Sequence, residues 1–75
     1  MNLIVDVGNS FVKLAVFKNN TIKHKEVVET KSILDSISKI KEKYKLIDSV
    51  IISSVGKLKE SDIKVIGEFF NLLVL

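Results

Sequence analysis

A short polar stretch between two apolar runs constrains this chain more than any other feature. Residues 3–5 are apolar and predict a buried strand, and residues 11–17 predict a second one. The stretch between them supplies an acid, a glycine, an amide and a hydroxyl, namely Asp6, Gly8, Asn9 and Ser10. The sequence therefore predicts a tight antiparallel hairpin with a polar turn.

The residue types in this turn suit the binding of a phosphate. Gly8 permits a positive φ and lets a ligand approach the main chain closely, and Asn9 also tolerates the left-handed region. Successive backbone N–H groups in such a turn, which here extends to Ser10, form a concave nest that attracts anions. Asp6 can hold Mg²⁺ through water, and the ion then meets the phosphate oxygens. An ordinary hairpin with a polar turn is the alternative, because short motifs have many false positives.

Two further places carry polar residues in apolar surroundings. Lys13 is the one charge in the second strand, and it either extends to a solvated edge or reaches back over the turn toward a phosphate. The predicted strand at 49–55 ends in small residues that include Ser53 and Ser54. Ligands of open α/β sheets bind outside the carboxyl ends of the strands, so this is either a second part of a site or a plain loop.

The remaining pattern predicts an α/β fold with the order βββαβαβ. A turn at Asn19 and Asn20 leads to a third strand at 21–28, which is rich in Lys and Glu as a guarded edge strand would be. Helical spacing of apolar residues follows at 30–45 and 59–70, and apolar strands at 49–55 and 72–75. We expect a mixed sheet, with three antiparallel strands and then parallel ones joined by right-handed crossovers, and helices packed on it.

Three local expectations accompany this order. The run at 50–52 is apolar without alternation, which predicts a strand buried on both faces. Ser32 and Asp35 resemble a capping box at the start of the first helix. His24 stands among charged residues with no second metal ligand nearby, so we expect a solvated side chain.

Composition limits the classes of function. The chain has 75 residues, enough for one thin domain, and its net charge of +3 comes from twelve Lys and no Arg. Arg is the usual residue for bidentate recognition of bases and phosphates, so we expect no nucleic-acid partner. There is no Cys, which suits a reducing cytoplasm, and no apolar run long enough to cross a bilayer, so we expect a cytoplasmic protein without a membrane partner.

The quoted motifs resemble a known family. The order βββαβαβ, with an acid that ends the first strand, resembles the actin-like ATPase and ribonuclease H-like folds. Residues 2–10, Asn-Leu-Ile-Val-Asp-Val-Gly-Asn-Ser, followed by Lys-Leu-Ala-Val-Phe at 13–17, are similar to the opening of a type III pantothenate kinase. The Ile-Ser-Ser-Val at 52–55 resembles a segment at the matching place in that family. The resemblance covers the whole chain but about the first third of a family member, so we expect residues 1–75 to be the N-terminal part of a kinase domain.

The resemblance implies an enzyme that transfers the γ-phosphate of ATP to pantothenate, the first step of coenzyme A synthesis. It implies that Asp6 serves the Mg²⁺–phosphate region, that Gly8, Asn9 and Ser10 line the phosphate loop, and that Lys13 neutralises phosphate charge. A homodimer and a monovalent cation, K⁺ or NH₄⁺, are also implied. The family's Gly-Ala-Asp-Arg segment, which carries the catalytic Asp and pantothenate contacts, is not in this sequence. We therefore expect no catalytic residue within 1–75, and no activity from the chain alone.

Two alternatives stay open at this point. In a ribonuclease H-like nuclease or resolvase, Asp6 would be one ligand of a two-metal site, which needs a second carboxylate near the fourth strand. That strand ends in Ser53 and Ser54, which argues against a nuclease. A noncatalytic binding or regulatory module is the other alternative.

Overall fold

The elements follow one another in the predicted order. A computed structural model of the chain describes residues 1–53 and 58–74. Its strands and helices are β1 (Asn2–Val7), β2 (Phe11–Lys18), β3 (Thr21–Glu29), the short 3₁₀ helix η1 (Thr30–Ser32), α1 (Ile33–Lys43), β4 (Ser49–Ser53), α2 (Glu60–Phe69) and β5 (Asn71–Val74). The order βββαβαβ is confirmed, with element bounds that differ from the predicted ones by a few residues. The predicted ends of β4 and β5, residues 54–55 and 75, lie outside the described residues.

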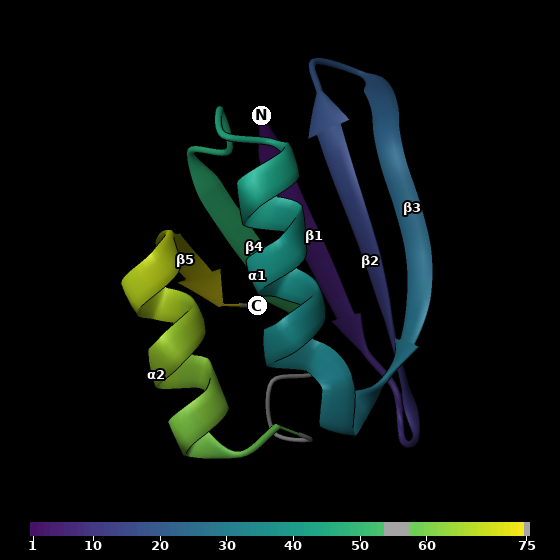
Figure 1. The fold of residues 1–75 in the computed structure, drawn as a ribbon, viewed down its shortest axis with the longest axis vertical. Coiled ribbons are helices and arrows are strands. Elements are labelled where there is room, and N and C mark those ends of the chain that lie inside the picture. The colour runs from purple at the N-terminus through teal and green to yellow at the C-terminus, as the bar shows by residue number, and fades with distance from the viewer. Residues whose placement is uncertain (54–57, 75) are drawn as a thin grey trace.

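The strands form one mixed sheet with the order β3-β2-β1-β4-β5. The first three strands pair antiparallel, whereas β1 pairs with β4 and β4 with β5 in parallel. Figure 1 shows that α1 and α2 both lie on the same face of this sheet. The predicted α/β class is confirmed, and the arrangement is consistent with a ribonuclease H-like fold.

The core fills the space between this sheet face and the two helices. Alternate residues of β1, β2 and β4 point into it, and so do residues at helical spacing from α1 and α2. Every residue of the core is apolar, and most are completely inaccessible to solvent. The buried set is Leu3, Val5, Val7, Val12, Leu14, Val16, Ile33, Ile37, Ile40, Val50, Ile52, Leu58, Ile66 and Phe70.

The opposite face of the sheet is not covered by any described element. Val50 and Ile52 are fully buried, but Ile51 between them is only partly buried, so the prediction that β4 is buried on both faces was wrong. The reason is that both helices pack on one side, which no pattern within β4 itself reveals. Phe11 and Val27 belong to this open face and are 57% and 58% exposed.

The start of α1 also departs from the prediction. Ser32 takes the N-cap position, but its side chain makes no capping hydrogen bond, so the capping box does not form. Its φ of −101° and ψ of 8° continue the turn of η1, whereas a capping side chain needs an extended backbone. Asp35 instead lies with Oδ2 3.5 Å from Nζ of Lys39, one helical turn later.

His24 is half-buried between β3 and α1 rather than solvated. Its ring lies 5.6 Å from the ring of Tyr44, and its Nε2 is 3.5 Å from Oε1 of Glu26. The Tyr44 hydroxyl donates a hydrogen bond to the carbonyl of Lys23 at 3.1 Å. The expectation of a solvated histidine failed because the pairing with β2 turns residue 24 toward the helix face of the sheet.

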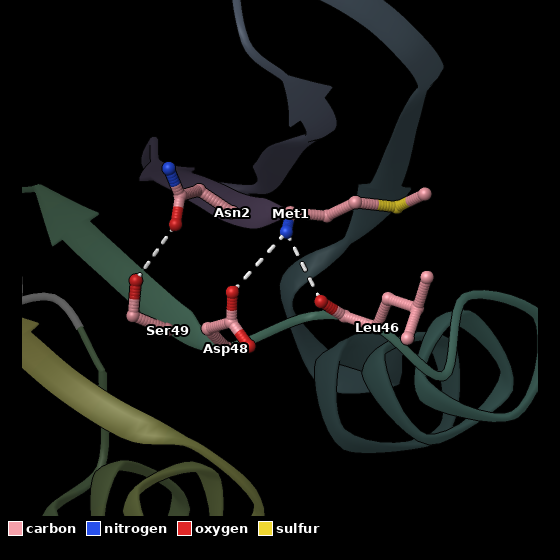
Figure 2. Close-up of polar contacts among 5 residues, drawn as sticks. All are labelled: Met1, Asn2, Leu46, Asp48 and Ser49. Atoms are coloured by element: carbon pink, nitrogen blue, oxygen red, sulfur yellow. Dashed lines mark hydrogen bonds and ion pairs between the residues drawn. The ribbon is translucent and has the colours of Figure 1, made fainter.

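Polar contacts tie the beginning of β1 to the segment that precedes β4 (Figure 2). The amino group of Met1 donates to the carbonyl of Leu46 at 3.0 Å and lies 3.5 Å from Oδ2 of Asp48. The amide of Asp48 donates to the carbonyl of Met1 at 2.8 Å, and Ser49 Oγ donates to Asn2 Oδ1 at 2.9 Å. These contacts help to fix the register of the parallel pair from its first residue.

The β1–β2 turn depends on Gly8 for a different reason from the predicted one. Among the described residues, Asn19 is the one with a positive φ, at 57°, so Gly8 does not adopt the left-handed backbone conformation. Its amide donates to the carbonyl of Phe11 at 2.9 Å, and a Cβ on Gly8 would lie 2.8 Å from that same oxygen. The glycine is therefore needed for the close approach of two backbone segments. The amide of Thr30 donates to the carbonyl of Ser10 at 3.0 Å and ties this turn to η1.

We expect Gly8→Ala to destabilise the chain, because the added methyl group meets a backbone oxygen that cannot move without opening the turn. Forced contacts of this kind cost about 1–3 kcal/mol. Urea unfolding followed by circular dichroism measures the change. Gly67→Ala, inside α2, is the matched control and should be neutral or stabilising, because Ala favours a helix more than Gly. Equal stability of Gly8→Ala and the wild-type chain would contradict the tight turn.

Candidate functional site

The polar residues of the first motif surround a cavity on the open face of the sheet. The cavity has a volume of about 440 Å³ and is lined by Asp6, Gly8, Asn9, Ser10, Phe11 and Lys13. The structure thus brings together all five residues that the sequence assigned to phosphate binding. Phe11 is an addition that the motif did not name, and alternation along β2 puts it on the same sheet face as Lys13.

Strand register explains how Asp6 and Lys13 reach this cavity. Asp6 stands opposite Lys13 of β2 on one side and opposite Ser53 of β4 on the other. Residues of one cross-strand row share a face of the sheet, and here it is the face that the helices leave open. The side chains of Asp6 and Lys13 are both exposed. A charged row is tolerated at this place because water can solvate it.

Ser53 contacts the carboxylate of Asp6 without lining the cavity. Its Oγ donates a hydrogen bond to Oδ1 of Asp6 at 3.1 Å. Of the two serines predicted at the end of the fourth strand, Ser53 therefore belongs beside the site, whereas Ser54 lies outside the described residues.

Several cavity residues have charged or N–H groups that form no ion pair or backbone hydrogen bond with the described part of the chain. In the described part of the chain, no ion pair within 4.0 Å includes Lys13 or Asp6. The amides of Asn9 and Ser10 donate to no backbone carbonyl in the same part, whereas the amide of Gly8 is used by Phe11. Ammonium and amide N–H groups are common partners of anions such as phosphate, and Lys13, Asn9 and Ser10 all line the cavity.

The donor set fits a magnesium ion that the ligand itself helps to hold. Asp6 is the one carboxylate that lines the cavity, and residues 1–53 and 58–74 contain no cluster of three or more His, Cys, Asp or Glu that could hold a metal. Mg²⁺ often binds to one or two carboxylates together with substrate phosphates and keeps several waters. The carboxylate of Asp6 could therefore help to hold such an ion only together with oxygens from a ligand. A two-metal nuclease centre lacks its second carboxylate here, because Ser53 stands beside Asp6 in the neighbouring strand.

No helix in the described ranges is long and apolar enough to cross a membrane.

Comparison with known proteins agrees with these features. The family model described as type III pantothenate kinase matches residues 2–75. A curated protein named type III pantothenate kinase from Christiangramia forsetii is 35% identical over 75 residues, which cover 100% of this chain and 31% of that protein. A second one, from Flavobacterium psychrophilum, is 38% identical over 60 residues, which cover 80% of this chain and 25% of that protein.

The chain spans about a third of the length of the first of these relatives and aligns with a quarter of the second. The match nevertheless includes every residue of the cavity and extends through β4, α2 and β5. Because the family model covers all of the chain except its first residue, the chain belongs to the type III pantothenate kinase family.

Proposed function

We propose that this chain is the part of an ATP-dependent pantothenate kinase that binds the nucleotide phosphates. In the longer protein, the γ-phosphate of ATP would pass to the primary hydroxyl of pantothenate, the first step of coenzyme A synthesis. The proposal is supported by the cavity on the open face of the sheet, where the residues of the first sequence motif meet beside the β1–β2 turn in a chain that matches this kinase family. The proposal concerns the longer protein, since the chain spans 31% of the Christiangramia forsetii relative.

Each cavity residue except Phe11 has a defined task in this proposal. The amides of Asn9 and Ser10 and the ammonium group of Lys13 bind phosphate oxygens, and Gly8 lets the turn close tightly enough to present those amides. Asp6 would hold, through water, the magnesium ion that accompanies ATP, and that ion would supply positive charge against the phosphates. Phosphoryl transfer depends mainly on positioning and charge stabilisation, so these groups are sufficient on the nucleotide side.

The remaining components of the reaction belong to the rest of the protein. Among the described residues that line the cavity, Asp6 is the one carboxylate and is assigned to the metal, so they offer no second carboxylate as the base that accepts the proton of the pantothenate hydroxyl. The family's Gly-Ala-Asp-Arg segment, which the resemblance identifies with that role, is not in the sequence. The monovalent cation, the homodimer and the cytoplasmic location stay predictions about the longer protein.

We expect the 75-residue chain alone to show no pantothenate phosphorylation, because the described lining of the cavity offers no carboxylate besides Asp6 as a base for the acceptor hydroxyl. A coupled assay of ADP release, with and without pantothenate, measures this. The positive control is a chimera in which the chain replaces the matched 31% of the Christiangramia forsetii protein. Pantothenate-dependent turnover by the chain alone, abolished in Asp6→Ala, would contradict the assignment of the base to another segment.

In the active chimera we expect Lys13→Met to lower kcat/KM for ATP roughly 10- to 150-fold, the effect of losing a charge-assisted phosphate contact worth about 1.5–3 kcal/mol. The melting temperature should stay the same, because the side chain is exposed and Met keeps its apolar stem.

Lys25→Met is the matched control for this substitution. Lys25 is also exposed and stands opposite Ala15, on the same sheet face as Lys13 but away from the cavity. We expect Lys25→Met to leave kcat/KM unchanged. Equal kinetics of Lys13→Met and Lys25→Met would remove Lys13 from the phosphate site.

A further inference from the structure

The contact between Ser53 and Asp6 joins the fourth strand to the candidate phosphate site. The two residues are 47 positions apart in the sequence and stand opposite each other in the parallel pair of β1 and β4. The hydroxyl donates to one carboxylate oxygen, Oδ1, over 3.1 Å. In the described part of the chain, no hydrogen bond to the other oxygen, Oδ2, is present, so Asp6 lines the cavity with one carboxylate oxygen that has no protein donor.

The same strand pair contains a second contact of the same kind, which allows a comparison. Ser49 Oγ donates to Oδ1 of Asn2 at 2.9 Å, where Figure 2 shows the two side chains facing each other. Both serines belong to β4, both are half-buried, and both point to the open face of the sheet. They differ in the acceptor, because Ser49 meets a neutral amide far from the cavity whereas Ser53 meets the carboxylate that lines it.

An exposed aspartate at a strand end can rotate among several side-chain conformations, and a carboxylate that holds a metal ion through water gains from having one of them fixed. A donor to one oxygen removes part of that freedom and leaves the second oxygen available to the hydrated ion. Residues that orient metal ligands in this way typically change metal affinity or activity by 10- to 100-fold when they are removed.

We propose that Ser53 is a positioning residue, whose hydroxyl holds the Asp6 carboxylate in the orientation that receives the hydrated metal ion of a bound nucleotide. This inference rests on the proposed function, because it needs a metal–nucleotide complex at Asp6. Ser53 itself does not line the cavity and acts through Asp6. In this proposal Ser53 has a role because it orients Asp6 in the neighbouring strand, and it makes no contact with the ligand itself.

The test measures binding of the Mn²⁺ complex of ATP to the 75-residue chain. Electron paramagnetic resonance gives the affinity, and Hα–Hβ coupling constants of Asp6 give its side-chain conformation. The variants are Ser53→Ala, Ser53→Thr, Asp6→Asn, the double variant Ser53→Ala/Asp6→Asn, and Ser49→Ala as the matched control. Melting temperatures show whether each variant folds.

We expect Ser53→Ala to weaken binding of the Mn²⁺–ATP complex about tenfold, which is the lower end of the effect of removing an orienting partner. The Hα–Hβ couplings of Asp6 should move to values averaged over several side-chain conformations. Ser53→Thr keeps a hydroxyl and should restore both properties, whereas Ser49→Ala should change neither. The double variant should bind no more weakly than Asp6→Asn alone, because Ser53 acts through that carboxylate.

Two results would overturn the inference while the proposed function stands. One is equal binding by Ser53→Ala and Ser49→Ala when Asp6→Asn is impaired, which would make Ser53 merely structural. The other is an additive loss in the double variant, which would show that Ser53 contacts the ligand independently of Asp6. Binding that does not depend on Asp6 at all would overturn the metal assignment in the proposed function, and the inference with it.

Discussion

The pairing of β1 with a different partner on each side is the constraint on which the rest of the structure depends. Antiparallel pairing with β2 closes the turn around Gly8. Parallel pairing with β4, which follows α1 in the sequence, brings Ser53 beside Asp6. Since β1 is hydrogen-bonded on both sides, its backbone groups are satisfied and its register is fixed. That register sets Lys13, Asp6 and Ser53 in one row, so the geometry of the site follows from the strand pairing.

The two faces of this sheet have different physical tasks. The helix side contains the core, whose buried residues in the described part of the chain are all apolar, and this core holds the strands in register. The open side carries the charged row and the cavity, where water or a ligand solvates the ionised groups at little cost. Packing both helices on one side therefore stabilises the fold and keeps the charges accessible at the same time. The charged row would be costly to bury under a third helix without partners for each group.

The sequence predicts what is local and leaves out what depends on distant segments. Apolar patterning identified β1, β2, β4, β5 and the two α-helices, and the turn at Asn19 and Asn20 placed β3. The β1–β2 turn motif identified a set of residues that the hairpin brings to one cavity. The failures have a common cause. Partial exposure of Ile51 depends on where the helices pack, and half-burial of His24 depends on its pairing with β2. The contact of Ser53 with Asp6 depends on the pairing of two strand residues that are 47 positions apart in the sequence. The need for Gly8 was predicted, but its reason, a carbonyl 2.8 Å from the absent methyl group, is visible only in three dimensions.

We propose that the amides of the β1–β2 turn face the phosphates of a nucleotide. A titration of the ¹⁵N-labelled chain with Mg·ATP, followed by two-dimensional NMR, tests this, with adenosine as the ligand that lacks phosphates. We expect the amide resonances of Asn9 and Ser10 to shift progressively with Mg·ATP and to stay in place with adenosine, while those of α2 do not respond to either. Shifts of equal size with adenosine, or shifts confined to α1 and α2, would contradict it.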